Sequence, residues 1–383
     1  MGAVIGLDAR MIGPVPTGLG NYASSLVRAL TSLDTAHTYV VIRSPAAPPT
    51  VPLGRQVSEV VIAGNLDTPA NLVRGRAISG LGLDLYHSLH HFVPPGVRVP
   101  RVVVTLHDLI WIEHRSLIRD GRFAALTSTA TNWFARAAIG YAMTRADRVI
   151  AVSSYTRDRA LAYYRLDPSR ITVVRHGIDH AAFAPSTSAA PGSPRYFLCL
   201  GNTRPYKNIP SVLHAFAQCA RDLADVDLVV AGRGDSTEPL QRLARQLGIG
   251  DRLRFMGIVD DRQRLELLQG AIALVFPSIV EGFGFPVLEA MTAGCPVVTS
   301  TCPALVELAD DAALVCHAER ADEIAAAMTR LATEPELRSA LRDRGLHRAA
   351  TFTWPRSAEQ TLRVYEGALE RVTLHAPRAP CAS

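Results

Sequence analysis

The chain has 383 residues, of which 48% are hydrophobic, so it is too long for one ordinary core and too apolar to be disordered, and we expect two globular domains. No stretch approaches the roughly 20 apolar residues of a membrane span, the N-terminus lacks the order of a signal peptide, and the six cysteines form no CxxC pair, so we expect a cytoplasmic protein without structural zinc or disulfides. The net charge of +5 divides into +7 for residues 1–190 (19 basic against 12 acidic residues) and −2 for residues 191–383 (21 against 23). The surplus of positive charge suggests an anionic partner for the first half. No nucleic-acid-binding motif is present, so we expect no nucleic-acid partner.

Short β-branched runs alternate with helical patterns along the chain, which is typical of parallel βαβ units. In the first half the expected strands are Val4–Leu7, Tyr39–Arg43, Glu59–Ala63, Leu85–His87, Val102–Leu106, Val149–Val152 and Thr172–Val174. Between the first two, one helical face collects Ala23, Leu26, Val27 and Leu30. These patterns predict a Rossmann-like domain over residues 1–185, in which ligands bind beyond the carboxyl ends of the strands.

A glycine-rich string, TGLGNYA, opens the first of these helices. Gly18 and Gly20 match the G-x-G-x-x-A fingerprint of dinucleotide-binding proteins, but ten residues separate Leu7 from Gly18, and the fingerprint needs its first glycine directly after the strand. We therefore expect backbone amides that bind an anion or a sugar rather than NAD(P), with a flexible surface turn as the alternative.

Histidines follow two of the expected strands. His107 comes at the end of the fifth strand, in the triplet HDL, where we expect it to face a ligand in either a catalytic or a structural role. His87, His90 and His91 lie in a loop bounded by prolines, so we expect them to line the site or pack rather than bind zinc.

The pattern of strands and helices restarts after a linker rich in Pro, Ser and Ala, Ala184–Pro194. The expected strands are Tyr196–Leu200, Asp227–Ala231, Leu253–Phe255, Ala273–Phe276, Val297–Ser300 and Ala313–Val315. A helix with one apolar face follows the first of them, carrying Ile209, Val212, Leu213, Phe216 and Ala217. A second Rossmann-like domain is therefore expected over residues 192–355.

Lys207 is the single lysine of a chain whose other 39 basic residues (40 − 1) are arginines. It lies in GNTRPYKN, between an expected strand and the helix that begins at Ile209. A cation near a helix N-terminus opposes the helix dipole at a cost of roughly 0.3–1 kcal/mol, and an anion placed between the two reverses this penalty. We therefore expect Arg204, Lys207 and helix amides to neutralise a diphosphate, with a solvated surface pair as the alternative.

The segment FPSIVEGFGFPVLEAM, Phe276–Met291, joins a strand to a helix whose first turn suits Pro286. Glu281 is expected in the loop and Glu289 about one turn into the helix. The amides of the intervening loop can donate to sugar hydroxyls, and a carboxylate can accept from both hydroxyls of a ribose; these loop residues are Gly282, Phe283, Gly284 and Phe285. A solvated acidic pair is the alternative.

Further motifs follow the expected strands in order, and they are RHGID (Arg175–Asp179), AGRGD (Ala231–Asp235), FMGIVDD (Phe255–Asp261), GCPVVTS (Gly294–Ser300) and FTW (Phe352–Trp354). With TGLGNY, HDL, GNTRPYKN and the E-x7-E spacing of Glu281 and Glu289, they cover nearly the whole chain. In these motifs the chain resembles family 4 of the retaining glycosyltransferases, and in particular its mannosyltransferase-like members.

The resemblance implies the GT-B fold, an α/β architecture of two Rossmann-like domains facing each other across a cleft. It implies that the final helix, Ala358–Glu370, crosses back, so that residues 356–383 join an acceptor-binding first domain, with Gly18 and Gly20 near the acceptor. Residues 192–355 would then form the donor-binding domain for a nucleotide-diphosphate sugar.

The resemblance also implies roles for single residues. Glu289 would bind the ribose, and Arg204 and Lys207 the diphosphate. Glu281 and the loop Gly282–Phe285 would bind the donor sugar, which His107 would approach from the first domain, so that Glu281 and His107 are the expected catalytic residues.

We therefore expect a retaining hexosyltransferase that needs neither a metal nor a cofactor, with GDP-mannose or a related GDP-sugar as donor and a glycan, lipid-linked or small-molecule hydroxyl as acceptor. The alternatives are a UDP-hexose or UDP-N-acetylhexosamine donor, a nucleotide-sugar epimerase or sugar-phosphate synthase, and a silent nucleotide-sugar-binding subunit. Arginines and aromatic residues in one segment suit peripheral contact with an anionic membrane, with an ordinary helix pair as the alternative; they are Arg115, Arg119, Arg122, Phe123, Trp133, Phe134, Arg136 and Tyr141.

Overall fold

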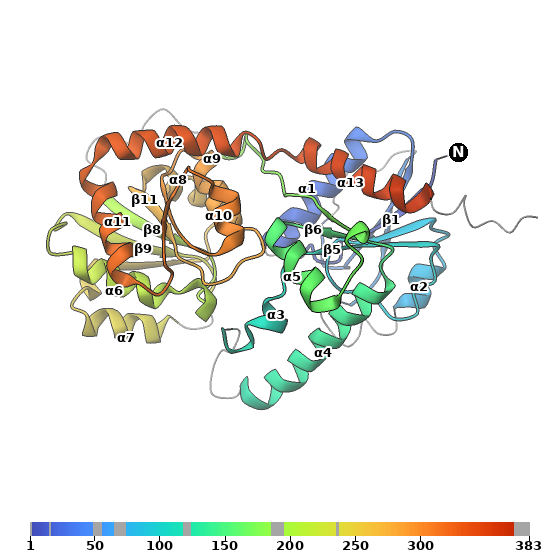
Figure 1. Cartoon of the computed structure of the whole chain (residues 1–383), viewed down its shortest axis with the longest axis horizontal. Coiled ribbons are helices and arrows are strands. Elements are labelled where there is room, and N and C mark those ends of the chain that lie inside the picture. Colours follow the sequence, from blue (N-terminus) through green and yellow to red (C-terminus); the bar gives the residue numbers. More distant parts are fainter. Residues whose placement is uncertain are drawn as a thin grey trace, which may run out of the picture. The chain divides into compact units, whose positions relative to one another are not determined.

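The computed structural model of the chain describes residues 2–14, 17–48, 56–64, 74–117, 124–184, 195–234 and 237–370. The chain divides into two compact units (Figure 1). The first comprises Met1–Leu109, Thr131–Gly177 and Trp354–Ser383, and the second comprises Ile110–Ala130 and Ile178–Thr353.

The first unit is built on a seven-stranded sheet in which every pair of neighbouring strands is parallel. The strand order is β3-β2-β1-β4-β5-β6-β7, with β1 at Val4–Asp8, β2 at Thr38–Arg43, β3 at Val57–Val61, β4 at Leu85–Ser88, β5 at Arg101–Leu106, β6 at Arg148–Ala151 and β7 at Ile171–Val173. The order reverses between β1 and β4, and ligands of open α/β sheets bind at such a switch point, beyond the carboxyl ends of the strands.

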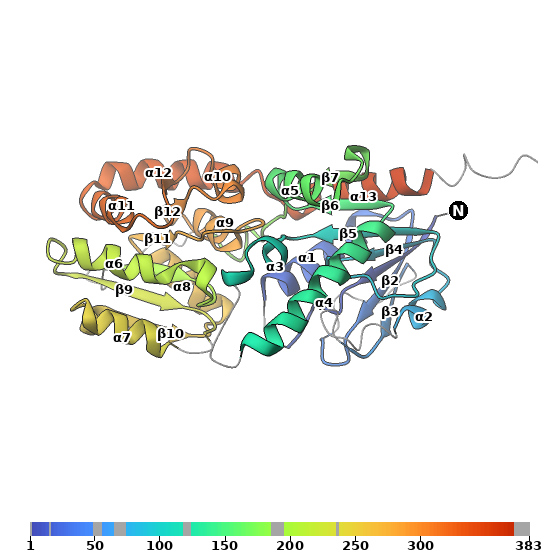
Figure 2. The same cartoon turned by 60° about the horizontal axis from the view of Figure 1, so that its bottom comes forward.

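Helices cover this sheet, and they are α1 (Gly18–Leu33), α2 (Gly75–Ser79), most of α4 (Ala124–Arg145), α5 (Ser154–Tyr164) and α13 (Trp354–Leu369). Thr17 caps α1, because its Oγ1 accepts from the Gly20 amide at 3.0 Å. The C-terminal helix α13 packs against α1, β5 and β6 (Figures 1 and 2), so the expected return of the chain to the first unit is confirmed.

The second unit contains a six-stranded sheet, also parallel, in the order β10-β9-β8-β11-β12-β13. Its strands are β8 (Arg195–Leu200), β9 (Val226–Ala231), β10 (Leu253–Gly257), β11 (Ala273–Phe276), β12 (Val297–Ser300) and β13 (Leu314–Cys316). Its helices are α3 (Ile110–Glu113), α6 (Ile209–Cys219), α7 (Glu238–Gln246), α8 (Asp261–Gly270), α9 (Phe285–Thr292), α10 (Pro303–Ala309), α11 (Ala321–Thr333) and α12 (Pro335–Ala349). Here the order reverses between β8 and β11.

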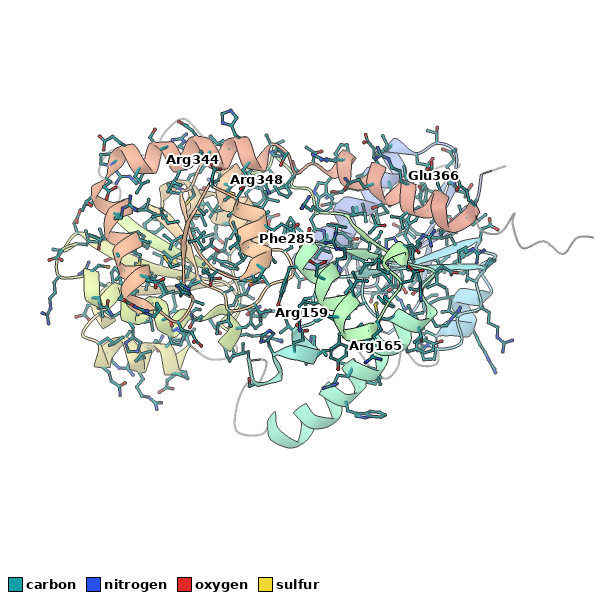
Figure 3. The ribbon with its side chains drawn as sticks, viewed as in Figure 1. Arg159, Arg165, Phe285, Arg344, Arg348 and Glu366 are labelled. Carbon is teal, nitrogen blue, oxygen red and sulfur yellow. The ribbon has the colours of Figure 1, made fainter. Side chains whose placement is uncertain are left out.

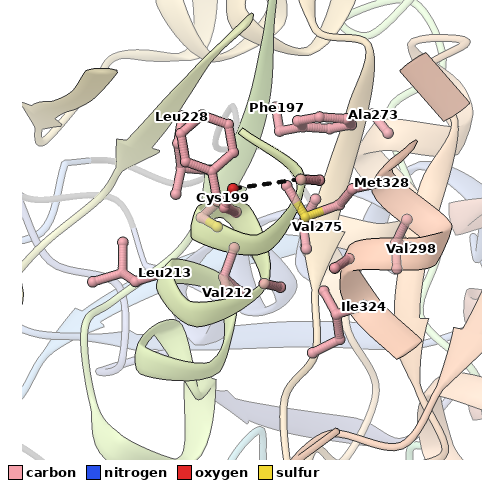
Figure 4. Close-up of a cluster of buried hydrophobic side chains, with 14 of the residues drawn as sticks. Phe197, Cys199, Val212, Leu213, Leu228, Ala273, Val275, Val298, Ile324 and Met328 are labelled. Atoms are coloured by element: carbon pink, nitrogen blue, oxygen red, sulfur yellow. Dashed lines mark hydrogen bonds between the residues drawn. The ribbon is translucent and has the colours of Figure 1, made fainter. Parts of the chain in front are cut away.

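Side chains from α6 and α11 form a buried apolar cluster on one face of this sheet (Figure 4). Val212 and Leu213 of α6 and Ile324 and Met328 of α11 meet the side chains of β8 and β11. On α12, where Figure 3 labels Arg344 and Arg348, the Arg348 guanidinium donates to two carbonyls near the end of α10, at 2.7 and 2.8 Å. A cation at this end of a helix also complements its dipole.

All thirteen strands expected from the sequence are present among the described residues, and their ends differ from the expected ones by at most two residues. The α/β class and the two parallel-sheet units are therefore confirmed. The final helix begins four residues earlier than expected, at Trp354, because Pro355 fits its first turn. Nearly all of the expected linker lies outside the described residues.

Candidate functional site

The loops that follow β8 and β11 meet at the switch point of the second sheet. The first loop ends in a 3-10 turn, Pro205–Lys207, and the second carries Glu281. The Lys207 ammonium donates to Glu281 Oε1 at 2.6 Å, and the two side chains are 11% and 12% exposed. The anion expected beside Lys207 is thus supplied, in this structure, by the protein itself.

Aromatic rings explain why Lys207 suits this place in a chain that otherwise uses arginine. Its Nζ lies 4.5 Å from the centroid of the Phe276 ring and 5.2 Å from that of Tyr206. Ring faces attract a cation, and together with Glu281 they enclose a compact group. An arginine has a wider, planar head with donors in fixed directions. We infer that this enclosure selects an ammonium.

Glycines at the strand ends let the loops come close. Gly201 and Gly232 have φ values of +131° and +135°, and a Cβ on Gly232 would lie 1.9 Å from the Gly201 carbonyl oxygen. Arg204 follows in the same loop, with its amide donating to Asn202 Oδ1 at 3.1 Å. In the described part of the chain, its guanidinium makes no hydrogen bond or ion pair, so the structure does not join Arg204 to the Lys207–Glu281 pair.

Glu289 lies in the second turn of α9, with 8% of its side chain exposed. Arg264 of α8 approaches it, with Nη1 3.4 Å from Glu289 Oε1, and also pairs with Asp261 at 2.5 Å. Burial raises the pKa of Glu289, the Arg264 cation acts in the opposite direction, and Asp261 raises the pKa further. A buried carboxylate therefore depends on one neighbouring arginine for its charge.

The start of α9 is shaped by Gly284, which has a φ of +111°. A Cβ there would lie 2.5 Å from Leu305 Cδ2, so the loop needs a glycine both for its backbone angle and for space. Phe285 begins the helix (Figure 3), and its ring meets Phe283 edge to face at 5.4 Å. Phe283 itself is buried and also contacts Phe352 at 6.0 Å. The loop between the two glutamates is thus a packed turn rather than a loose one.

His107 lies directly after β5 in the first unit and is 6% exposed. Its Nε2 is 2.9 Å from the carbonyl oxygen of Leu89, and a carbonyl only accepts, so Nε2 carries the hydrogen and Nδ1 carries the lone pair. The Tyr22 ring and the imidazole meet edge to face, with their centroids 4.8 Å apart. Burial lowers the pKa of His107 to about 4, against a smaller opposite effect of the Leu89 carbonyl. The side chain is therefore neutral at neutral pH and presents a hydrogen-bond acceptor.

The glycine-rich turn has two different glycines. Gly18 is the exposed first residue of α1. Gly20 is buried, its amide donates to Thr17 Oγ1, and a Cβ added to it would lie 3.1 Å from that oxygen and 3.5 Å from the Met11 carbonyl. Gly20 thus contributes to capping and close packing at the start of α1, and its expected place near the acceptor stays a prediction.

Three further histidines stack near His107. The rings of His90 and His91 lie 3.8 Å apart, and His107 is 6.0 Å from His90 and 5.5 Å from His176. Within the described ranges, no group of three or more histidine, cysteine, aspartate or glutamate side chains is placed to hold a metal ion.

His87 belongs to a separate, internal network. Its Nδ1 is 2.6 Å from the Tyr365 hydroxyl, and its Nε2 is 2.9 Å from Thr105 Oγ1, which also bonds the Tyr22 hydroxyl at 2.9 Å. These bonds join β4, β5, α1 and α13 through the interior of the unit, so the role of His87 is structural.

Two family models together match residues 16–348. The model described as "Glycosyltransferase Family 4" matches residues 16–182, and the one described as "Glycosyl transferases group 1" matches residues 183–348. The chain belongs to glycosyltransferase family 4.

Relatives of this family-4 chain include the MMP alpha-(1->4)-mannosyltransferase of Mycolicibacterium hassiacum, which is 32% identical over 58% of this chain and 55% of that protein. The O-antigen chain mannosyltransferase B of Escherichia coli is 26% identical over 74% of each chain. The chain thus spans little more than half of the first relative and about three quarters of the second. The solved structure of a sucrose-phosphate synthase from Thermosynechococcus elongatus matches 96% of this chain with a TM-score of 0.75 at 18% identity, which shows the shared GT-B fold.

Among the residues expected to form the site of a family-4 enzyme, the structure brings Lys207 and Glu281 into contact and places Glu289 on the adjoining helix α9. Arg264 was not predicted from the sequence, because its partner lies on another helix and no spacing along the chain joins them.

A buried ion pair at the end of β1 was not predicted either. Arg10 Nη2 donates to Asp8 Oδ2 at 2.6 Å, both side chains have no exposed surface, and the Tyr86 hydroxyl donates to the same oxygen at 2.6 Å. The spacing of two opposite charges at positions i and i+2, at the end of a strand, could have indicated this ion pair.

Proposed function

We propose that the chain is a retaining glycosyltransferase that moves a hexose, with mannose from GDP-mannose or a related GDP-sugar favoured, to an acceptor hydroxyl. The observation that carries the proposal is the contact between Lys207 and Glu281 at the switch point, together with the buried Glu289 on α9, the helix that follows the Glu281 loop. The names of the two mannosyltransferase relatives support the choice of sugar. In this proposal the second unit binds the donor and the first unit binds the acceptor.

The departing diphosphate gains negative charge in the transition state, and preorganised cations stabilise such charge strongly. An ammonium has three N–H donors, so Lys207 can hold Glu281 and still donate to a phosphate oxygen. Arg204 has five donors that make no bond to a described residue, and we assign it to the same diphosphate. These cations support a reaction that needs no divalent metal.

Glu281 and the amides of Gly282, Phe283, Gly284 and Phe285 are assigned to the donor sugar, and Glu289 to the ribose. For retention of the anomeric configuration we favour attack on the same face as the leaving phosphate, which helps to take the acceptor proton. His107 is neutral in this scheme, and its Nδ1 accepts a hydrogen bond from a sugar hydroxyl. Gly18, exposed at the start of α1, remains assigned to the acceptor.

A panel of nucleotide sugars tests this function, with release of GDP or UDP and the products as readouts, in the presence and absence of candidate hydroxyl acceptors. We expect GDP release and transfer with retained configuration, unchanged by EDTA. UDP release would favour the UDP-hexose or UDP-N-acetylhexosamine alternative, and an epimer or a sugar phosphate as product would favour an epimerase or a sugar-phosphate synthase. Loss of activity in EDTA that magnesium restores would contradict metal independence. Glu281→Ala and His107→Ala serve as controls, because both should lower turnover far more than nucleotide affinity.

We further propose peripheral contact with an anionic membrane through the surface of α4. Trp133 is 73% exposed there, and Arg136 donates to the hydroxyl of Tyr163, which is 41% exposed. Arg119, Arg122 and Phe123 of this segment lie outside the described residues. No helix among the described residues combines the length and apolar character needed to cross a bilayer. Co-sedimentation with anionic and neutral vesicles at low and high salt tests the contact, and equal recovery with both vesicle types would contradict it.

A further inference from the structure

Arg264 of α8 is the one cation within ion-pair distance of Glu289 among the described residues. It is held on several sides. Its Nη1 lies 3.4 Å from Glu289 Oε1, its Nη2 lies 2.5 Å from Asp261 Oδ1, and its guanidinium carbon lies 5.3 Å from the centroid of the Phe183 ring. Its side chain is 17% exposed. The guanidinium is therefore fixed between one buried and one exposed carboxylate.

The two carboxylates differ in what they need from Arg264. Asp261 is 73% exposed, so water stabilises its charge, whereas Glu289 is 8% exposed and has lost most of that solvation. Among the described residues, the charged groups that act on Glu289 are Arg264 and Asp261, and both belong to α8, which packs against α9. In the described part of the chain, no ion pair joins Glu289 to α10, α12, β11 or β12.

We propose that Arg264 is a positioning residue for the nucleotide, which holds Glu289 ionised and oriented so that the carboxylate accepts both hydroxyls of the donor ribose. This inference rests on the proposed ribose role of Glu289. An ionised carboxylate has only acceptors, which suits two hydroxyl donors, whereas a protonated one gives up part of that capacity. The separation of 3.4 Å between Arg264 Nη1 and Glu289 Oε1 is longer than a close hydrogen bond, so the Glu289 oxygens can still accept hydrogen bonds. In the described structure, the Arg264 Nε is buried without a hydrogen-bond partner, so the guanidinium has an unused donor.

The proposal predicts a dependence on pH. The proposal requires that Glu289 be ionised at neutral pH when a cation stands at position 264, because that cation opposes the rise in pKa that burial causes. In Arg264→Met the carboxylate keeps its burial and the repulsion of Asp261 but loses the cation, so its pKa rises further. Recognition of the ribose is then weak below the raised pKa and returns above it. Arg264→Lys keeps the charge and should keep most of the affinity.

The experiment compares GDP and UDP with their 2′-deoxy forms by titration calorimetry on the full chain, at about pH 6 and about pH 8.5. In the wild type we expect the ribonucleotide to bind about tenfold more tightly than the deoxy form at both pH values, as expected for a hydroxyl bonded to a charged group. In Arg264→Met this preference should disappear at the lower pH and return at the higher one. Arg262→Met is the matched control, since Arg262 lies on the same helix, is 87% exposed and pairs with Glu266.

Two further variants separate the possible outcomes. In Glu289→Gln the preference for the ribonucleotide over its 2′-deoxy form should be lost at both pH values. If this preference is kept, Glu289 does not bind the ribose, and that part of the proposed function is wrong. If Glu289→Gln behaves as expected but Arg264→Met keeps the preference at both pH values, or loses affinity equally for ribo and deoxy forms, the positioning role of Arg264 is overturned. Asp261→Asn removes the competing carboxylate and should extend the preference to lower pH, which keeps the test open if Arg264→Met does not fold.

Discussion

The two units of the chain place polar groups in their interiors in opposite ways. The five buried histidines in the described residues all belong to the first unit, and they are His87, His90, His91, His107 and His176. The described histidines of the second unit are all at least partly exposed, and its candidate site contains charged pairs, Lys207 with Glu281 and Arg264 with Glu289. Among the described residues, the first unit also buries a few charged side chains: Asp8 and Arg10 pair with each other, and Asp34 lies within hydrogen-bond distance of Tyr39 and His37.

This difference matches the chemistry that the proposed function asks of each unit. A departing diphosphate is anionic, so its site needs full positive charges, and even a nearby carboxylate must be balanced by a cation. An acceptor hydroxyl is neutral and both donates and accepts, which suits imidazoles that burial keeps uncharged. The basic surplus of residues 1–190 therefore does not describe the interior of the first unit, where uncharged side chains predominate around His107.

The largest effect that follows from the comparison is unfolding of the first unit in acid. Burial lowers the pKa of His87 and His91 to about 3 and that of His107 to about 4, whereas an unfolded histidine has a pKa of about 6.5. Because the folded pKa values are depressed, the stability that these neutral groups contribute is complete above about pH 6.5 and is lost as the pH falls toward their folded values. At about 1.4 kcal/mol per pKa unit, their sum reaches a large part of the roughly 5–15 kcal/mol that stabilises a domain.

We therefore expect the first unit to unfold between about pH 6 and pH 4 while the second stays folded. Pulsed hydrogen exchange with mass spectrometry can locate the loss, if samples are equilibrated at each pH and labelled at one fixed pH. His317→Gln is a suitable control, since His317 is 69% exposed and should leave the profile unchanged. Simultaneous loss of protection in both units, or earlier loss in the second, would show that the buried histidines do not set acid stability.

The second prediction removes a charge from the second unit. Lys207→Met leaves Glu281 buried without its cation, and breaking a buried pair in this way costs about 3–5 kcal/mol. We expect turnover to fall by about a hundredfold or more, since the leaving diphosphate also loses a cation. Lys207→Arg should also lose most activity, because Phe276, Tyr206 and Glu281 enclose a compact group.

A double variant, Lys207→Met with Glu281→Gln, separates stability from chemistry. It removes both charges, so thermal unfolding should return toward that of the wild type while nucleotide release stays low. Full activity of Lys207→Arg would mean that the enclosure does not explain the single lysine. Recovery of activity in the double variant would mean that Lys207 has no role in the reaction.

Local pattern in the sequence was sufficient to predict the strands and the loops that carry the candidate site residues. Short runs of apolar residues predicted every described strand, and the loops after β8 and β11 and the position after β5 carry the expected Lys207, Glu281 and His107. The contacts between loops were not predictable, because hydrophobic periodicity does not say which strands are neighbours. Lys207 and Glu281 are 74 positions apart and meet only because β8 pairs with β11. Arg264 was missed for the same reason, since it faces Glu289 from another helix.

The smallest of the three effects compares two buried threonines on strands of the two units. Thr105 of β5 bonds both the Tyr22 hydroxyl and His87 Nε2, whereas Thr299 of β12 donates to one carbonyl, that of Phe276, at 3.2 Å. Valine has nearly the same shape, so each substitution removes mainly the hydroxyl. Thr299→Val should cost about 1 kcal/mol, and Thr105→Val about 2–3 kcal/mol, because it leaves two buried polar partners unsatisfied. Urea denaturation at about pH 8, where histidines are neutral, measures both. Equal costs would mean that the network of Thr105, Tyr22 and His87 adds no stability beyond that of a single hydrogen bond. Thr105→Val should also lower turnover more than nucleotide affinity, because Tyr22 packs against His107.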